Sequence, residues 1–248
     1  MDSFATTPSL SGKTVLITGG ARRIGRHMAL TAARAGANII VHHAHSPNEA
    51  QEVCAQARRM GVDAHALTAD LNDMGQAGSL ISAALCFGPL DMIINNAAIF
   101  ENLAPLDTTL NDWLRHINTN LTAPFLISRA FASSLEEGKQ GRIVNILDWR
   151  AQRPGPDHFP YTISKAGLAA MTQSLAAALA PRIQVNGLAF GAILPPSDKP
   201  ESSDLPQSVP AGRWATLDEV GQTLLFLLCG PTYITGEIIH LDGGRHLI

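Results

Sequence analysis

The chain has 248 residues, a formal net charge of −3, 46% hydrophobic residues and 16% charged residues. This length fits a single α/β domain, and the weak negative charge gives no electrostatic reason to expect a nucleic acid or an acidic membrane as a partner. The low charged fraction indicates that some surface is buried between subunits. Residues 1–13 contain no apolar run, and no segment of the sequence is apolar over a length that could span a bilayer. We therefore expect a soluble, cytoplasmic protein.

Short apolar runs alternate with longer amphipathic segments along the whole chain. Strands are predicted at residues 14–18, 38–42, 63–67, 91–95, 142–147, 182–188 and 237–241. Helices are predicted at residues 24–35, 48–60, 76–87, 110–135, 161–179 and 218–229. This alternation predicts an α/β fold of one domain over residues 1–248, a Rossmann fold whose doubly wound parallel sheet has about seven strands with helices on both faces.

A glycine-rich turn joins the first predicted strand to the first predicted helix. In TGGARRIG (residues 18–25), the glycines let the backbone approach a pyrophosphate, and the helix N-terminus faces negative charge. The strand–turn–helix context indicates a dinucleotide site. Its expected cofactor-binding residues are Gly19, Arg22, Arg23, Ile24 and Gly25.

The end of the second predicted strand indicates which nucleotide binds. It reads VHHAHS and lacks the carboxylate that usually holds the ribose 2′-hydroxyl of NAD. Arg22, His45 and Ser46 instead supply cationic and hydroxyl groups, which favour a 2′-phosphate and therefore NADPH. The alternative is that Arg22 and the histidines are solvated loop residues.

Later strand ends extend the predicted cofactor site. Asp70 is placed either to accept from the adenine amino group or to cap the following helix. In IINNAA (residues 93–98), small side chains leave room for a cofactor, although the two asparagines also suit a turn. The further expected cofactor-binding residues are Asp70, Leu71, Asn96, Ala97, Tyr161, Lys165, Gly191 and Ile193.

Asp148, Tyr161 and Lys165 form the candidate catalytic group. Tyr161 and Lys165 are four residues apart, so on a helix their side chains leave the same face. A phenol that donates a proton, an ammonium that lowers the phenol's pKa and a nearby carboxyl group can deliver a proton while a hydride arrives from elsewhere.

The proline-rich segment 191–212 and the three cysteines also bear on function. Residues 191–212 contain several prolines and serines and follow a predicted strand, so they form a surface loop, a substrate lid, or both. Cys54, Cys86 and Cys229 have no metal-ligand or redox spacing, and we expect them to be buried, reduced and inert.

These motifs together resemble the short-chain dehydrogenase/reductase family over nearly the whole chain. The resemblance rests on TGGARRIG, Asp70, NNAA (95–98), Asn120 in NLTAPF, Tyr161-x-x-x-Lys165, VNG (185–187) and ITGEIIHLDGG (234–244). It implies that Tyr161 is the acid/base, that Lys165 binds the nicotinamide ribose and lowers the pKa of Tyr161, and that Asn120 relays protons through water to Lys165.

Three departures from the common pattern narrow the resemblance. Arg23 stands where a third glycine is usual, Asp148 where the catalytic serine is usual, and Phe190 where proline is common. Arg23 and Asp148 resemble the pteridine reductase branch, which includes bacterial dihydromonapterin reductases. VHHAHS and LDGGRHL also resemble members of that branch.

The narrower resemblance implies a pterin or folate substrate, with Arg23, Phe100, Asp148 and Tyr161 as substrate-binding residues. Phe100 would stack on the pterin ring, Arg23 would bridge cofactor phosphate and substrate, and Asp148 would help to protonate a ring nitrogen. The simpler alternatives are that Phe100 is a core aromatic, that Asp148 caps or pairs locally, and that Arg23 faces solvent.

We therefore predict an NADPH-dependent reductase of a dihydropterin or dihydrofolate. The alternatives are a reductase of a sugar, steroid or acyl ketone, and a non-catalytic NADPH-binding sensor or scaffold. The family resemblance also implies a homotetramer, with helices 110–135 and 161–179 paired across one interface and the C-terminal segment near another.

Overall fold

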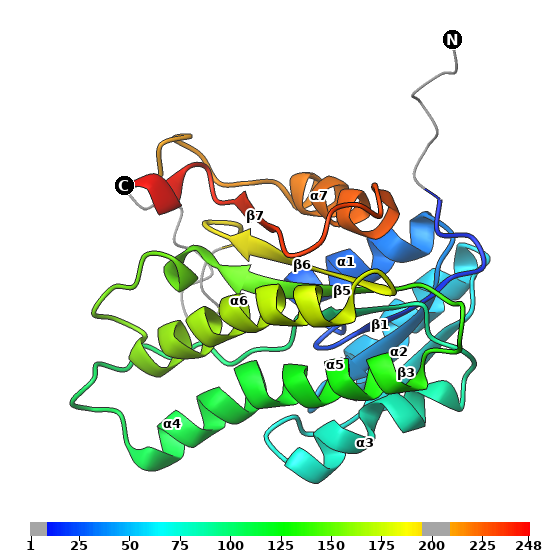
Figure 1. The fold of residues 1–248 in the computed structure, drawn as a ribbon, viewed down its shortest axis with the longest axis horizontal. Coiled ribbons are helices and arrows are strands. Elements are labelled where there is room, and N and C mark those ends of the chain that lie inside the picture. The colour runs from blue at the N-terminus through cyan, green and yellow to red at the C-terminus, as the bar shows by residue number, and fades with distance from the viewer. Residues whose placement is uncertain (1–8, 195–208) are drawn as a thin grey trace.

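The computed structural model describes residues 9–194 and 209–248, which contain one seven-stranded sheet (Figure 1). Its strand order is β3-β2-β1-β4-β5-β6-β7, and every neighbouring pair is parallel. The strands are β1 Thr14–Ile17, β2 Asn38–His43, β3 Ala64–Thr68, β4 Met92–Asn95, β5 Gly141–Asp148, β6 Ile183–Phe190 and β7 Ile238–Leu241. The single Rossmann-type sheet predicted from the alternating runs is confirmed.

Helices cover both faces of this sheet (Figure 1). On one face α1 packs against α2 and α7, and on the other α5 packs against α3 and α6. The helices are α1 Arg23–Arg34, α2 Pro47–Arg59, α3 Met74–Leu85, α4 Leu110–Ile117, α5 Ala123–Ser134, α6 Phe159–Leu179 and α7 Leu217–Cys229. Because both faces are covered, central strands such as β6 are buried throughout, which explains their continuous apolar runs.

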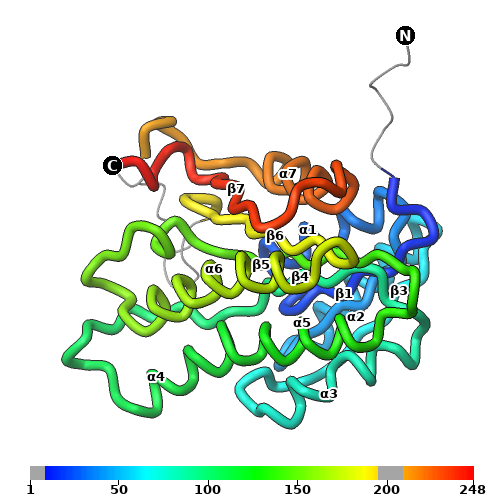
Figure 2. Tube along the Cα trace, in the orientation of Figure 1, coloured from blue at the N-terminus to red at the C-terminus, as the bar shows by residue number. Residues whose placement is uncertain are grey.

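The helix predicted at 110–135 is interrupted. Figure 2 shows the chain continuing from α4 into α5, but residues Asn118–Thr122 form a π-helical turn between them. Such a turn carries an extra residue within a helix and is common at functional sites. Here it contains Asn120, whose side chain is fully buried.

The cysteine prediction is correct for one residue and wrong for two. Cys54 is buried in the core between α2 and the sheet, whereas Cys86 is exposed and Cys229 is half-buried. The last two lie at the ends of α3 and α7, where the apolar helix faces give way to loops. All three are free thiols.

No helix within residues 9–194 and 209–248 has both the length and the apolar character needed to cross a membrane.

Candidate active site

A cavity of about 570 Å³ opens at the carboxyl ends of the parallel strands, beside the β1–β4 crossover. In a doubly wound sheet this is the edge at which ligands bind, and the volume is typical of small-molecule sites. The cavity brings together ten of the predicted cofactor-binding residues, namely Gly19, Arg22, Arg23, Ile24, Gly25, His45, Asp70, Leu71, Asn96 and Ala97. His42, Ala44, Asn72, Ala98, Ile99, Arg115 and Thr119 also line it.

The glycine-rich turn is packed too closely for larger residues. A Cβ on Gly25 would lie 2.1 Å from the carbonyl oxygen of Gly19. The Asn96 side chain donates to the carbonyl oxygens of Thr18 (2.8 Å) and Gly19 (3.1 Å). Asn96 is therefore more than a turn former, because it fixes the backbone that faces the cavity.

His42 supports the same turn from β2, a role the sequence reasoning missed. Its Nδ1 accepts from the Gly19 N–H at 3.1 Å, and its Nε2 lies 3.0 Å from the carbonyl oxygen of Ala69. Burial lowers the pKa of His42 to about 4, so the ring is neutral at physiological pH. A neutral ring with its proton on Nε2 satisfies both contacts.

The predicted 2′-phosphate residues lie where β2 meets α2. His45 is exposed, and Ser46 precedes the first residue of α2 without using its side chain as a cap. Arg22 extends toward this end of α2, with Nε 3.9 Å from Glu49 of its first turn. Glu49 is the acidic neighbour that the sequence reasoning missed, because it follows the strand by one helical turn. A helix N-terminus and an arginine together suit a phosphate.

Asp70 does not cap the following helix. Its carboxylate accepts from the N–H of Asn72 at 2.9 Å, while Asp73 caps α3 by accepting from Gly75 and Gln76. The helix-cap alternative for Asp70 is therefore wrong. Asp70 lines the cavity, which leaves its predicted contact with adenine as a prediction.

Asp148, Tyr161 and Lys165 come together between β5 and α6. The Tyr161 hydroxyl donates to Asp148 Oδ2 at 3.1 Å, and the Arg150 N–H donates to Asp148 Oδ1 at 2.9 Å. Lys165 Nζ donates to the carbonyl oxygen of Ile146 at 2.7 Å and lies 5.7 Å from the centre of the Tyr161 ring. Asp148 thus caps a local turn, as one alternative proposed, and also contacts the phenol.

Burial is the largest cause of the pKa shifts of Asp148, Tyr161 and Lys165. It raises the pKa of Asp148 and lowers the pKa of Lys165 to about 8. Burial and then the negative charge of Asp148 raise the pKa of Tyr161 well above its usual value. The expected lowering by Lys165 is not found, since the opposing effect comes from the charge of Arg150. Tyr161 therefore keeps its proton near neutral pH.

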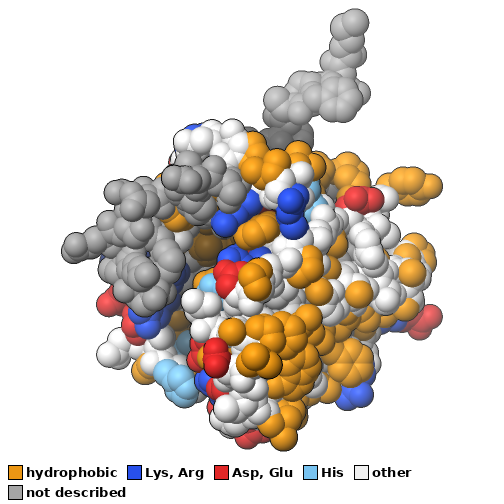
Figure 3. Space-filling view, turned by 90° about the vertical axis from the view of Figure 1, so that its left-hand side faces the viewer, with side chains coloured by type: hydrophobic (Ala, Val, Ile, Leu, Met, Phe, Trp, Pro, Cys, Tyr) orange, Lys and Arg blue, Asp and Glu red, His pale blue; other side chains and the backbone are white. Residues whose placement is uncertain are grey.

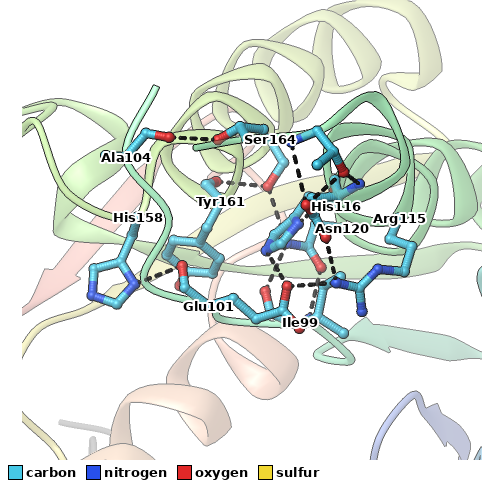
Figure 4. A network of polar contacts seen from close by, with 12 residues as sticks. Ile99, Glu101, Ala104, Arg115, His116, Asn120, His158, Tyr161 and Ser164 are labelled. Atoms are coloured by element: carbon cyan, nitrogen blue, oxygen red, sulfur yellow. Dashed lines mark hydrogen bonds and ion pairs between the residues drawn. The ribbon is translucent and has the colours of Figure 1, made fainter. Parts of the chain in front are cut away.

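Asn120 is held in a polar network next to this group (Figure 4). Its Oδ1 accepts from the Ile99 N–H at 2.9 Å, and its Nδ2 donates to the Ile99 carbonyl oxygen at 3.0 Å and to Ser164 Oγ at 3.1 Å. Ser164 donates in turn to the Tyr161 carbonyl oxygen. The network ties the π-helical turn to α6 and to the segment that follows β4.

Phe100 lies at the surface beside Tyr161 rather than in the core. Its side chain is 47% exposed, which rules out the core-aromatic alternative. The ring stacks on His158 at 4.0 Å between centroids and meets the edge of Tyr161 at 4.6 Å. His158, which the sequence reasoning missed, also lies 2.9 Å through Nδ1 from the Glu101 carbonyl oxygen (Figure 4).

The segment after β6 is only partly described. Gly191 packs so tightly that a Cβ would lie 2.7 Å from Cα of Asp242, and Ile193 is buried. Most of the predicted lid at 191–212 lies outside the described residues, because residues 195–208 are not among them.

Known proteins resemble this chain in sequence and in fold. The chain is 32% identical over 241 residues to a 3-oxoacyl-[acyl-carrier-protein] reductase of Synechocystis, covering 95% of this chain and 98% of that protein. It is 35% identical to the structure of FolM alternative dihydrofolate reductase 1 from Brucella canis complexed with NADP, with a TM-score of 0.86 and coverage of 96% and 95%.

A blue fluorescent protein from a metagenomic library, solved with NADPH, is 30% identical with a TM-score of 0.87 and covers 96% of this chain and 99% of its own. Nucleotide in these two solved relatives agrees with the cofactor predicted from the sequence. The family model for short chain dehydrogenase matches residues 13–206. The chain therefore belongs to the short-chain dehydrogenase/reductase family of oxidoreductases.

Proposed function

We propose that this oxidoreductase reduces a dihydropterin or dihydrofolate to its tetrahydro form with NADPH. The observation that carries the proposal is the largely buried carboxyl group of Asp148, 14% exposed, which accepts a hydrogen bond of 3.1 Å from the Tyr161 hydroxyl. The Tyr161 ring in turn contacts the exposed ring of Phe100. Reduction of a C=N bond needs a proton at nitrogen, and a carboxyl group with a raised pKa can help to supply it. The similarity to the Brucella canis structure supports the same substrate class.

The residues present fit NADPH. The tightly packed glycine turn offers backbone N–H groups and a helix N-terminus that would hold the pyrophosphate. Arg22 and His45 of the cavity and the neighbouring Ser46 would hold the 2′-phosphate. Lys165 would hold the nicotinamide ribose. When bound, NADPH supplies the hydride, and the protein orients the ring beside the substrate.

The chain's own residues would manage the proton. Tyr161 keeps its proton near neutral pH and shares a hydrogen bond with Asp148, so the pair can donate one proton to substrate and recover it from solvent. Lys165, with a pKa of about 8, is mostly cationic at pH 7 and balances negative charge that develops nearby. Asn120 would relay protons toward Lys165 from its fixed place in the π-helical turn.

Phe100 and Arg23 would bind the substrate ring. The exposed surface of Phe100 offers a stacking platform, and a ring stacked there would lie beside the proton donor, because Phe100 contacts Tyr161. Arg23 lines the cavity next to the glycine turn, in a left-handed conformation with φ of 51°. It would reach both the cofactor phosphate and the polar edge of a pterin.

A steady-state assay with NADPH and dihydrobiopterin, dihydromonapterin or dihydrofolate tests the proposal. We expect turnover of at least one substrate and a loss of about 10²-fold or more in kcat for Asp148→Asn. Asp148→Ser restores the residue usual in the family and is the matched comparison. No turnover of any of the three substrates would refute the proposal.

Reduction of an acyl ketone is the second candidate, because the chain is 32% identical to a 3-oxoacyl-[acyl-carrier-protein] reductase. It predicts NADPH oxidation with a 3-oxoacyl thioester and an Asp148→Ser variant that keeps or gains activity. The pterin proposal predicts a loss for the same variant. Tight NADPH binding with no oxidation by either substrate class would favour the non-catalytic alternative.

We also propose that the protein is a cytoplasmic homotetramer. Apolar side chains gather on one face of the molecule (Figure 3). Helices α4, α5 and α6 carry exposed Leu110, Leu114, Phe125 and Ile163, which supports pairing of these helices between subunits. Light scattering after size exclusion should give about four times the 26.3 kDa chain mass. A monomer at micromolar concentration would contradict this assignment.

A further inference from the structure

Arg150 lies directly beside the candidate catalytic group, on the short helical turn Trp149–Ala151 that follows β5. Its side chain is only 12% exposed, and its Nε is buried with no hydrogen-bond partner among the described residues. The guanidinium lies 4.8 Å from the centre of the Trp149 ring, which the C-terminal Arg245 also contacts at 4.2 Å. Burial and the contact with Trp149 therefore fix the position of the Arg150 side chain.

The Arg150 guanidinium lies between Asp148 on one side and Asp157 and Phe100 on the other. One side faces the proton-delivering pair, with Nη1 3.9 Å from Asp148 Oδ1. The other side binds Asp157, whose carboxylate lies 2.8 Å from Nη2. The same guanidinium carbon is 5.8 Å from the centre of the Phe100 ring. Arg150 is thus within reach of both the carboxyl group and the aromatic ring proposed to bind substrate.

Asp157 continues the connection to Phe100. Its carboxylate lies 3.6 Å from Nε2 of His158, the ring on which Phe100 stacks. His158 adopts a left-handed backbone with φ of 50°, which costs free energy in a residue other than glycine and persists where surroundings hold it. Contacts with Asp157 and with the Glu101 carbonyl oxygen hold it here.

We propose that Arg150 is a positioning residue that sets the protonation of the Asp148–Tyr161 pair and, through Asp157 and His158, fixes Phe100. The inference rests on the proposed function for the meaning of the Phe100 contact. Its electrostatic part concerns only this chain and holds for any substrate.

The charges around Asp148 give the sign of the effect. Tyr161 and Lys165 face it from α6, Arg150 from the turn after β5, and Arg245 from the C-terminal turn; each positive charge favours the carboxylate. Arg150 lies in the same turn as the backbone N–H that Asp148 accepts from, and a side-chain substitution keeps that N–H. Removing the guanidinium charge therefore raises the pKa of Asp148.

Arg150→Gln and Arg150→Lys form the matched pair, since the lysine keeps the charge and the glutamine does not. The titration of Asp148 is followed by carbon NMR of protein labelled at aspartate carboxyl carbons, with Asp148→Asn assigning the signal. We expect Arg150→Gln to move this titration to higher pH by about one unit or more, and Arg150→Lys to stay close to wild type. In a plot of kcat/KM against pH, the limb that reports the titration of Asp148 is expected to shift by the same amount and in the same direction.

Asp157→Asn gives an independent variant should Arg150→Gln fail to fold. It removes the negative charge that balances Arg150, so the Asp148 titration is expected to move to lower pH. An Asp148 titration that is the same in wild type, Arg150→Gln and Asp157→Asn overturns the proposal. That measurement needs no substrate, so its failure is distinct from a failure to turn over pterins.

Discussion

Acid is expected to weaken the fold through His42, the buried histidine beneath the glycine-rich turn. Both ring nitrogens are used in the neutral state, Nδ1 by the Gly19 N–H and Nε2 by the Ala69 carbonyl oxygen. Protonation would place a hydrogen on Nδ1 against the N–H that it accepts from. The ring is only 2% exposed, so water cannot replace the lost contact.

The size of the effect follows from the two pKa values. The pKa of His42 is about 4 in the fold and 6.5 in the unfolded chain, so between these values the unfolded chain binds a proton that the folded protein does not. The contribution of His42 to the free energy of unfolding is therefore fully present above pH 6.5 and is lost as the pH drops toward 4. The full loss from this group is about 3 kcal/mol, and about 2 kcal/mol of it is lost between pH 7.5 and pH 5.

Urea unfolding at several pH values between 7.5 and 5 measures this loss. His42→Asn keeps a side-chain acceptor but no titrating group, so it should be less stable than wild type at pH 7.5 by about 1 kcal/mol and lose about 2 kcal/mol less on acidification. His45→Asn, an exposed neighbour, is the control and should follow wild type. Equal acid losses in wild type and His42→Asn would refute the reasoning.

Three further changes test other parts of the structure. Gly25→Ala forces a Cβ against the Gly19 carbonyl oxygen and should cost about 1–3 kcal/mol in unfolding free energy and abolish the thermal shift given by NADPH; an unchanged shift would contradict this. Tyr161→Phe removes the hydroxyl that contacts Asp148 and should lower kcat by about 10²–10⁴ while calorimetry shows intact NADPH binding. Thr216→Ala breaks the capping box of α7 and should cost about 1 kcal/mol in urea unfolding, with no effect on KM.

The parallel sheet was predictable because its strands are buried on both faces and their apolar runs are uninterrupted. The glycine turn and the Tyr161–Lys165 spacing were also predictable, since each depends on residues close in sequence. The π-helical turn was not, because the Asn and Thr residues of 118–122 predict a weak helix but not an extra residue within it. The side chain of Asn120 in that turn is hydrogen-bonded to residue 99, and this contact joins residues 21 apart in the sequence.

Long-range contacts explain what else the sequence reasoning missed. In the sequence, His42 is one of several histidines at the end of a strand, and nothing distinguishes it from the others. Its role depends on the contact with Gly19, which is 23 residues away. Arg150 and His158 lie in the connection between β5 and α6, which contains only a short helical turn. In such a segment the periodicity of the sequence does not indicate which residues are neighbours. Their charge and aromatic character next to Asp148 were the only available signals. Glu49 could have been found, because an acid in the first turn of a helix faces the loop that precedes it.

The π-helical turn makes the length of the α4–α5 segment a fixed quantity. An α-helix advances about 100° per residue, and the π-helical turn already absorbs one extra residue. Deleting one residue from 118–122 would let regular α-helix form with both flanks facing as before, whereas inserting a further residue would rotate one flank against the other by about 100°. The deletion would take Asn120 from its contacts with residue 99 and Ser164, and the insertion would turn the apolar side of α5 from the sheet. Changes in chain length, which surface loops absorb, are therefore expected to be tolerated here less than substitutions.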